Sequence, residues 1–178
     1  MDAGATPQSA GALEHADAHP RAAIITISTS KATGEGQDKG GERLLALAKR
    51  LGVEVIGRDL IPDRRELIEE RLRHWADVER CALVLTTGGT GLSPSDVTPE
   101  ATRAVIEREA PGIPHAMREA SRPHTSNWML SRAVAGTRGA CLIVNFPGNP
   151  ASIDETAEAI AGALTHALAL IAGRPSGH

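Results

Sequence analysis

Aromatic residues are nearly absent from this 178-residue sequence, which has one Phe, two Trp and no Tyr. The hydrophobic residues, 41% of the chain, must therefore form a core of Leu, Ile, Val and much Ala, and such a core packs helices closely against a sheet. The length is typical of one domain. We expect a single domain in which helices cover a sheet.

The sequence also has neither a large excess of one charge sign nor a long hydrophobic stretch. The net charge is −3, with acidic and basic residues interleaved, so no large basic surface is available for nucleic acid. The longest apolar runs, at residues 22–27 and 81–85, are far shorter than the roughly 20 residues of a membrane span, and the N-terminus has no signal-peptide pattern. We therefore expect a cytoplasmic protein that binds small molecules, with neither a membrane nor nucleic acid as partner.

Cysteine is scarce too. Cys81 and Cys141 both fall within predicted strands, where small, buried, free thiols are typical of a reducing compartment. A buried apolar setting disfavours the thiolate, so we expect no nucleophilic or redox role for either residue. The histidines are scattered without catalytic-triad or zinc spacing, and no G-x-S-x-G motif is present, which disfavours a Ser-His-Asp hydrolase.

The sequence does contain a regular alternation of strand-like and helix-like segments. Four short β-rich apolar runs predict strands, at residues 22–28, 53–61, 81–86 and 140–146. This alternation predicts a three-layer α/β/α fold with a mostly parallel central sheet. The domain is expected to span residues 21–173, between a flexible N-terminal tail at 1–20 and a short tail at 174–178.

Helical stripes with a period of 3.6 residues separate the predicted strands. Gly52 is expected to end the first helix, and a long last helix, after Pro150, should cover a face of the sheet. The helix capped by Thr98 is expected to run to about Glu109, before short helical pieces at 113–134. The apolar positions that define the other stripes are Leu44, Leu47, Ala48 and Leu51, then Ile68, Leu72, Trp75 and Ala76, then Ile153, Ala157, Ile160, Leu164, Leu168 and Ile171.

Three loops leave the predicted strands at their carboxyl ends, at residues 61–63, 86–96 and 146–150. Ligands bind at this edge of open parallel sheets because loops and helix N-termini converge there. The second loop begins TTGGTG, whose glycines let an anion approach backbone amides. The run fits neither a Walker loop nor a dinucleotide fingerprint. It predicts a cradle for phosphate or an oxyanion, although a tight strand-to-helix turn would also explain the glycines.

Two acidic residues stand at such strand ends. Asp63 follows Pro62 after the second predicted strand, and Asp96 closes the Gly-rich loop after the third. If these two strands are neighbours, the carboxylates can face one point and hold a hard cation such as Mg²⁺ together with substrate phosphates. The alternative roles are a turn residue for Asp63 and a helix cap for Asp96.

Other polar residues near these loops have two interpretations each. Asp38, in the run DKGG before the first helix, can bring another carboxylate to the same edge or simply start the helix. Arg118 and Arg132 can attract an anionic substrate or be solvated. Asn149, in the sharp loop PGNP, can bond its own turn or a ligand.

Five motifs follow one another along the chain: LIPD at 60–63, TTGGTG at 86–91, DVTPEA at 96–101, LSRA at 130–133 and PGNP at 147–150. In this order they resemble the Mog/MoaB family of molybdenum-cofactor biosynthesis, over about residues 20–173. The resemblance implies a molybdopterin adenylyltransferase, which transfers AMP from Mg-ATP to the terminal phosphate of the dithiolene pterin and releases pyrophosphate. It also implies a homotrimer.

The resemblance, taken with the loops, also implies roles for residues. Asp63 and Asp96 are the expected catalytic residues and Mg²⁺ ligands at the ATP site. The remaining expected binding residues lie around the phosphates or on the pterin side: Asp38, Thr87, Gly88, Gly89, Thr90, Gly91, Ser131, Pro147, Gly148 and Asn149.

Two alternatives to the adenylyltransferase remain. The run STSK at 28–31 departs from the Asp and Arg that the family commonly has after its first strand, which leaves open a non-catalytic molybdopterin-binding scaffold of the MoaB type. Related domains also occur in molybdate-insertion enzymes and in CinA-type proteins, which keep the fold and change the chemistry. The motif DVTP at 96–99 looks unlike the CinA type.

Overall fold

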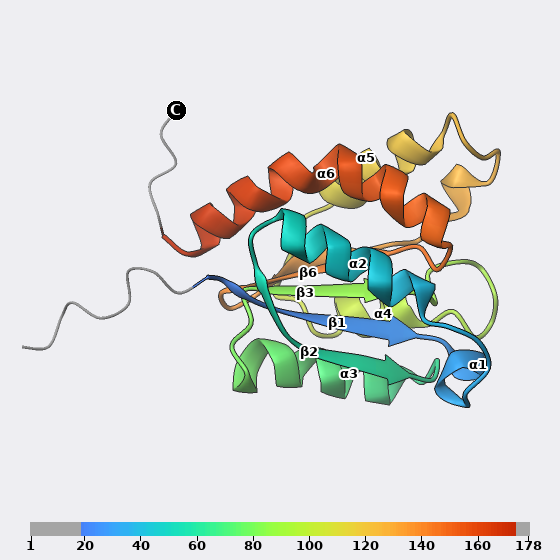
Figure 1. Ribbon diagram of the computed structural model, residues 1–178, viewed down its shortest axis with the longest axis horizontal. Coiled ribbons are helices and arrows are strands. Elements are labelled where there is room, and N and C mark those ends of the chain that lie inside the picture. The colour runs from blue at the N-terminus through green and yellow to red at the C-terminus, as the bar shows by residue number, and fades with distance from the viewer. Residues whose placement is uncertain (1–18, 174–178) are drawn as a thin grey trace, which may run out of the picture.

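Four parallel strands and two antiparallel ones form one six-stranded sheet in the order β2-β1-β3-β6-β5-β4 (Figure 1). The computed structural model describes residues 19–173. Strands β2, β1, β3 and β6 are parallel, and β5 and β4 run antiparallel to their neighbours. The strands are β1 (Arg21–Ile27), β2 (Glu54–Ile61), β3 (Leu83–Thr87), β4 (Arg108–Glu109), β5 (Ala135–Arg138) and β6 (Cys141–Phe146).

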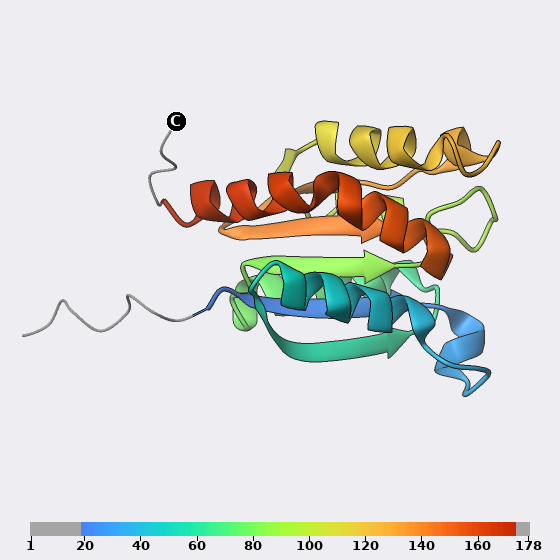
Figure 2. The ribbon, with the colours of Figure 1, turned by 45° about the horizontal axis from the view of Figure 1, so that its top comes forward.

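Helices cover both faces of this sheet, so the predicted three-layer α/β/α fold with a mostly parallel sheet is confirmed (Figures 1 and 2). One face is covered by α2 (Lys39–Arg50), α5 (Gly112–Ser121) and α6 (Pro150–Ile171). The other is covered by α3 (Arg65–Arg73), its π-helical extension η1 (His74–Val78) and α4 (Thr98–Arg103). Two short elements complete the chain, α1 (Thr29–Ala32) and the 3₁₀ turn η2 (Trp128–Leu130).

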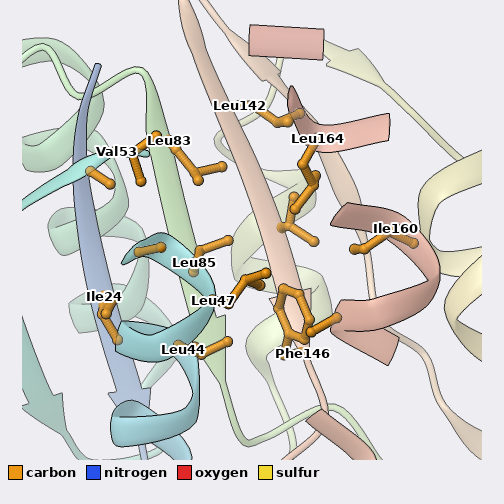
Figure 3. Close-up of a cluster of buried hydrophobic side chains, with 14 of the residues drawn as sticks. Ile24, Leu44, Leu47, Val53, Leu83, Leu85, Leu142, Phe146, Ile160 and Leu164 are labelled. Atoms are coloured by element: carbon orange, nitrogen blue, oxygen red, sulfur yellow. The ribbon is translucent and has the colours of Figure 1, made fainter. Parts of the chain in front are cut away.

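The first core cluster lies between the sheet and the helical layer that contains α2 and α6, where aliphatic side chains from both layers pack together (Figure 3). Leu44 and Leu47 from α2 meet Leu85 on β3, and the only Phe of the sequence, Phe146, is fully buried at the end of β6. A fully buried side chain of this size contributes roughly 1.5–3 kcal/mol. The Leu-, Ile- and Ala-rich core expected from the scarcity of aromatics is therefore the one observed.

The second cluster lies on the opposite face and contains Trp75, which is 8% exposed, as its place on an apolar stripe predicts. Its Nε1 donates to Asp59 Oδ2 at 2.6 Å. Gly57 makes room for the ring, because a Cβ there would lie 2.1 Å from Trp75 Cη2. Both cysteines are buried and unpaired, and desolvation raises the pKa of Cys81 to about 11 and that of Cys141 to about 12, which disfavours the reactive thiolate.

Several elements differ from the sequence-based predictions, among them the short α1 and β4, for which no helix or strand was predicted. The helix expected over 98–109 ends at Arg103, because the following chain turns into β4, where Glu107 N–H donates to Thr137 O at 2.8 Å. Strand β5 was not predicted at all, since its four residues, AGTR, carry no clear apolar run. It forms a hairpin with β6 through Gly139, whose φ is +52°.

Helices α2 and α6 follow the sequence-based predictions. Gly52, with φ +68°, stands directly after the C-cap of α2. On α6, the predicted apolar positions from Ile153 to Leu168 are buried. The tails predicted at 1–20 and 174–178 lie outside the described residues, apart from residues 19 and 20. Within residues 19–173, no helix combines the length and apolar character needed to cross a membrane.

Candidate functional site

The carboxyl ends of the parallel strands meet at one edge of the sheet, on the right in Figure 1. The register pairs Ile27 with Ile61 and Thr87 with Phe146, so the loops that follow β1, β2, β3 and β6 leave at the same level. The three loops singled out by the sequence are therefore brought together.

The strands that precede Asp63 and Asp96 are not neighbours, contrary to the condition on which the shared metal site was predicted. Strand β1 lies between β2 and β3, because β1 pairs with both. The Gly-rich loop after β3 nevertheless reaches both acids. A Cβ at Gly89 would lie 3.2 Å from Asp63 Oδ1, and a Cβ at Gly91 would lie 2.9 Å from Asp96 Oδ2. The loop itself therefore connects the two carboxylates across the end of β1.

Gly88 and Gly89 shape this loop through left-handed backbone angles, with φ of +100° and +63°. Gly88 also packs against β1, because a Cβ there would lie 2.1 Å from Ile27 O. Thr98 holds the base of the loop, since its Oγ1 donates to Gly88 O at 2.9 Å and its N–H donates to Gly89 O at 3.1 Å. The cap role predicted for Thr98 is thus wrong, and Val97 occupies the N-cap position of α4 without a side-chain bond.

Some backbone amides of the loop are bonded within the protein and others have no acceptor. Gly88 N–H donates to Phe146 O at 3.3 Å, so it is not available to a ligand. The N–H groups of Gly89, Thr90 and Gly91 donate to no acceptor within residues 19–173. Unpaired, closely spaced amides of this kind favour an anion. The predicted phosphate cradle is therefore shorter than the whole TTGGTG run.

Asp63 is held by Thr29, the first residue of α1. Thr29 N–H and Thr29 Oγ1 both donate to Asp63 Oδ2 at 2.8 Å, and Asp63 N–H donates to Thr29 Oγ1 at 3.1 Å. Asp63 Oδ1 has no hydrogen-bond donor among the described residues and lies on the side of Gly89. Thr29 lies in the run that departs from the family pattern, and sequence reasoning did not assign it a role.

Asp96 is oriented by its own loop. Its N–H donates to Ser93 O and its Oδ2 accepts from Ser93 N–H, both at 2.9 Å. Across residues 19–173, neither Asp96 nor Asp63 takes part in an ion pair. In the same range, no group of three or more His, Cys, Asp or Glu side chains could hold a metal ion. Two carboxylates suit Mg²⁺ only where water and substrate phosphate oxygens supply the remaining ligands.

Asp38 performs the helix-start role that the sequence left open. Its Oδ1 accepts from Gly41 N–H at 2.9 Å, and its Oδ2 accepts from Thr26 Oγ1 at 2.9 Å and from Arg58 Nη2 at 3.3 Å. Its side chain is 19% exposed and borders a hollow of about 440 Å³ together with Lys39. A further role of Asp38 in ligand binding stays a prediction.

Ser131 and Pro147 line one hollow of about 210 Å³, so the structure brings these two predicted residues together. Arg118, one of the two arginines that the sequence offered for an anionic substrate, also lines it, together with Trp128, an aromatic ring that the sequence did not single out. The hollow lies between α5, η2 and the start of α6, and hydrophobic periodicity gave no signal that these three segments meet. Its polar and aromatic lining suits a flat, polar ring with an anionic group.

The PGNP loop is tied to the Gly-rich loop. Thr87 Oγ1 donates to Pro147 O at 2.7 Å, and a Cβ at Gly148 would lie 3.4 Å from Gly88 Cα. Asn149 Oδ1 accepts from Ala151 N–H at 3.1 Å and so caps α6. Of the two interpretations of Asn149, a bond within its own turn or a bond to a ligand, this oxygen follows the first. The hydroxyl of Thr87 is thus used within the protein, whereas Thr90 Oγ1 makes no hydrogen bond within residues 19–173.

Comparison with known proteins agrees with this geometry. Residues 23–166 match the family described as "Probable molybdopterin binding domain". The chain is 43% identical over 143 residues to the molybdopterin adenylyltransferase of Escherichia coli K12, an alignment that covers 79% of this chain and 73% of that protein. It is 37% identical over 150 residues to the molybdenum cofactor synthesis protein cinnamon of Drosophila melanogaster, of whose length it spans about a quarter, 25%.

A solved structure is similar throughout the described fold. The molybdopterin biosynthesis enzyme MoaB from Thermus thermophilus superposes with a TM-score of 0.82 and 43% sequence identity, and the match covers 88% of this chain and 98% of that one. The resemblance first indicated by five short motifs therefore extends over most of the chain. The chain belongs to the Mog/MoaB family of molybdopterin-binding domains.

Proposed function

We propose that this protein is a molybdopterin adenylyltransferase, which transfers AMP from ATP to the terminal phosphate of molybdopterin and releases pyrophosphate. The observation that carries the proposal is the placement of two carboxylates, Asp63 and Asp96, beside one glycine-rich loop, in which the N–H groups of three residues, 89–91, have no acceptor within residues 19–173. That arrangement suits a triphosphate and a hard cation. Bacterial relatives that bear this name, at 40–43% identity, support it.

Asp63 and Asp96 are the residues that would hold Mg²⁺, each through the oxygen that the protein leaves without a donor. Bound there, Mg²⁺ would neutralise charge on the triphosphate and on the departing pyrophosphate. The carboxylates are set in advance, Asp63 by Thr29 and Asp96 by Ser93, so little reorganisation is needed when the nucleotide arrives.

The reaction needs no protein nucleophile. An oxygen of the pterin phosphate forms a bond to the α-phosphorus of ATP while the bond from that phosphorus to the bridging oxygen breaks and pyrophosphate leaves. The N–H groups of Gly89, Thr90 and Gly91 stabilise the charge that develops on the phosphoryl oxygens. Catalysis is then largely a matter of positioning and charge neutralisation.

The pterin is assigned to the hollow lined by Ser131 and Pro147. Trp128 provides an aromatic face, and Arg118 a cation for the pterin phosphate. The PGNP loop joins this hollow to the Gly-rich loop through the bond from Thr87 Oγ1 to Pro147 O. A pterin phosphate bound there would therefore lie beside the nucleotide phosphates.

The test is a pyrophosphate-release assay with ATP, Mg²⁺ and molybdopterin, run on the wild type, Asp96→Asn and Asp154→Asn. Asp154→Asn is a matched acid-to-amide control, because the ion pair of Asp154 with Arg43 is exposed. We expect Asp96→Asn to lower turnover about a hundredfold or more, with an unchanged unfolding midpoint. A wild type that releases no pyrophosphate, or an Asp96→Asn variant that matches the control, would contradict the proposal.

A non-catalytic molybdopterin-binding scaffold is the second candidate, motivated by the altered run at residues 28–31. The contacts between Thr29 and Asp63 favour the enzyme instead, since they orient a carboxylate at the nucleotide side. Calorimetry separates the two. Molybdopterin binding without any binding of Mg-ATP would support the scaffold.

We further propose that residues 21–173 form the catalytic domain, that the protein acts in the cytoplasm and that it assembles as a homotrimer. Two buried, unpaired cysteines are consistent with a reducing compartment. The trimer rests on the family resemblance. Light scattering should give a mass three times that of the 18.6 kDa chain, and a monomer or dimer mass would contradict the assembly.

A further inference from the structure

Arg132 lies between η2 and β5 and reaches across to the loop that carries Asp96. Its backbone N–H donates to Thr90 O at 2.9 Å. Its Nε donates to Gly91 O at 2.7 Å, and its Nη2 donates to Asp96 O at 2.7 Å. One residue thus bonds three carbonyl groups of the same loop. The sequence left open whether this arginine attracts an anionic substrate or is solvated, and in the structure each of its guanidinium nitrogens is instead engaged by the protein.

The loop has few other restraints between Gly91 and Asp96. Residues 92–95 are exposed, so apolar packing does not hold them. Among the described residues, the only other hydrogen bonds of this stretch join Ser93 to Asp96 and to Ser95, which are local. Thr98 secures the base of the loop, not its outer half. Arg132 is therefore the long-range connection that sets where the Asp96 carboxylate lies.

Glu100 holds the guanidinium in place from the opposite side. Its Oε1 accepts from Arg132 Nη1 in an ion pair between two partly exposed side chains. Burial acts to raise the pKa of the Glu100 carboxyl, but its bond to its own backbone amide, its bond to Arg132 and the charges of Arg132 and Arg103 together lower it below the ordinary value. Glu100 therefore stays ionised at neutral pH and fixes the direction of the arginine fork.

We infer that Arg132 is a positioning residue for the proposed adenylyl transfer: by bonding Thr90, Gly91 and Asp96 it holds the loop amides and the Asp96 carboxylate at the fixed separation that Mg-ATP requires. The inference rests on the proposed function. Arg132 does not touch the reacting atoms. Its effect is on the nucleotide side, because none of these bonds reaches the hollow assigned to the pterin.

Lysine cannot replace this arginine. A guanidinium is a rigid, planar fork that bonds acceptors in several directions at once, whereas an ammonium is a single point on a flexible stem. Arg132→Lys keeps the charge, and the backbone bond to Thr90 O is retained. It loses the simultaneous bonds to Gly91 O, Asp96 O and Glu100. The substitution therefore separates charge from geometry.

The matched control is Arg138→Lys. Arg138 is also a multiply bonded arginine, with its Nε and Nη2 on Asp77 and its Nη1 on Val105 O at 3.0 Å. The two side chains are similarly exposed, 31% for Arg132 and 25% for Arg138. Arg138 is the last residue of β5 and pairs with Cys141 at the amino end of β6, so it lies at the edge of the sheet opposite the site. The Arg138→Lys variant therefore measures how the loss of an anchored guanidinium changes the stability of the protein when the loop that carries Asp96 is untouched.

The experiment measures the KM for Mg-ATP, the KM for molybdopterin and kcat for the wild type and both variants. For Arg132→Lys we expect kcat to fall about a hundredfold and the KM for Mg-ATP to rise about tenfold, because a displacement of about 1 Å at a positioned group has effects of this size. The KM for molybdopterin should change by less than about twofold. Arg138→Lys should leave all three constants near those of the wild type.

Amide hydrogen exchange of the free protein is the second measurement, and it does not depend on turnover. Faster exchange over residues 88–97 in Arg132→Lys, with unchanged exchange there in Arg138→Lys, is the expected result. Wild-type kinetics in Arg132→Lys, equal losses for both substrates, or equal losses in the two variants would overturn the inference. If the wild type transfers no AMP, the proposed function fails, and the exchange data still decide whether Arg132 orders the loop.

Discussion

Gly88→Ala tests whether the Gly-rich loop depends on its close approach to β1. Gly88 has φ +100°, and an added Cβ would lie 2.1 Å from Ile27 O, far inside any ordinary contact. Gly34 provides the control, because its φ of +93° is nearly the same and a Cβ there meets nothing within 4 Å. The two substitutions therefore share the backbone strain and differ only in the contact.

The magnitude follows from that difference. A left-handed φ costs a residue with a Cβ about 1–2 kcal/mol, and this applies to both variants. The entropy lost by the unfolded chain when Gly becomes Ala is also common to both. Only Gly88→Ala must in addition move the loop away from Ile27, which strains the bonds of Gly88 to Phe146 O and Thr98. Overpacking together with weakened hydrogen bonds costs about 3 kcal/mol more.

Thermal unfolding followed by circular dichroism is the appropriate assay. At this chain length about 3 kcal/mol corresponds to a lowering of Tm by roughly 6–12 °C, so Gly88→Ala should unfold that far below Gly34→Ala. Urea midpoints at constant slope should give the same order. Equal Tm values for the two variants would show that the loop does not lie against β1 in the way described, and the reasoning would be refuted.

Two further predictions concern Asp63 and the thiols. Thr29→Val removes the hydroxyl that bonds Asp63 and keeps the side-chain shape, and Thr33→Val is the control, because its lost hydroxyl contacts only the backbone of α1. We expect Mg²⁺ activation of AMP transfer to be about tenfold weaker in Thr29→Val than in Thr33→Val. Equal effects in the two variants would contradict the role of Thr29. Burial raises the pKa values of Cys81 and Cys141 from 9.0 to about 11 and about 12. The contribution of these thiols to the free energy of unfolding is therefore complete below pH 9 and is lost as the pH rises towards the raised values, because the unfolded chain then gives up its thiol protons first. Alkylation by iodoacetamide at pH 8 should therefore be slow in the native protein and fast in urea, and rapid native labelling would contradict the burial of these thiols.

The sequence could predict every element whose signal is local. The four parallel strands are short β-rich runs, and α2 and α6 have apolar positions at helical spacing, so their faces and their order along the chain follow from periodicity. Residues within one loop are also close by necessity, which is why TTGGTG with Asp96 indicated a phosphate site. The family motifs extended this to an expected activity, because five short runs in one order are far more specific than any single run.

Contacts between distant segments were decided only by the tertiary structure. Which strands are neighbours depends on hydrogen bonds between segments far apart in the chain, so nothing local indicated that β1 separates β2 from β3 or that the short β5 pairs with β6. The same holds for the contacts between Thr29 and Asp63, 34 residues apart, and between Arg132 and Gly91, 41 residues apart. The sequence alone determined the four parallel strands, the apolar faces of the long helices and the place of the polar loops along the chain. Folding decided which side chains position the acids, because that choice depends on packing in three dimensions and leaves no periodic pattern.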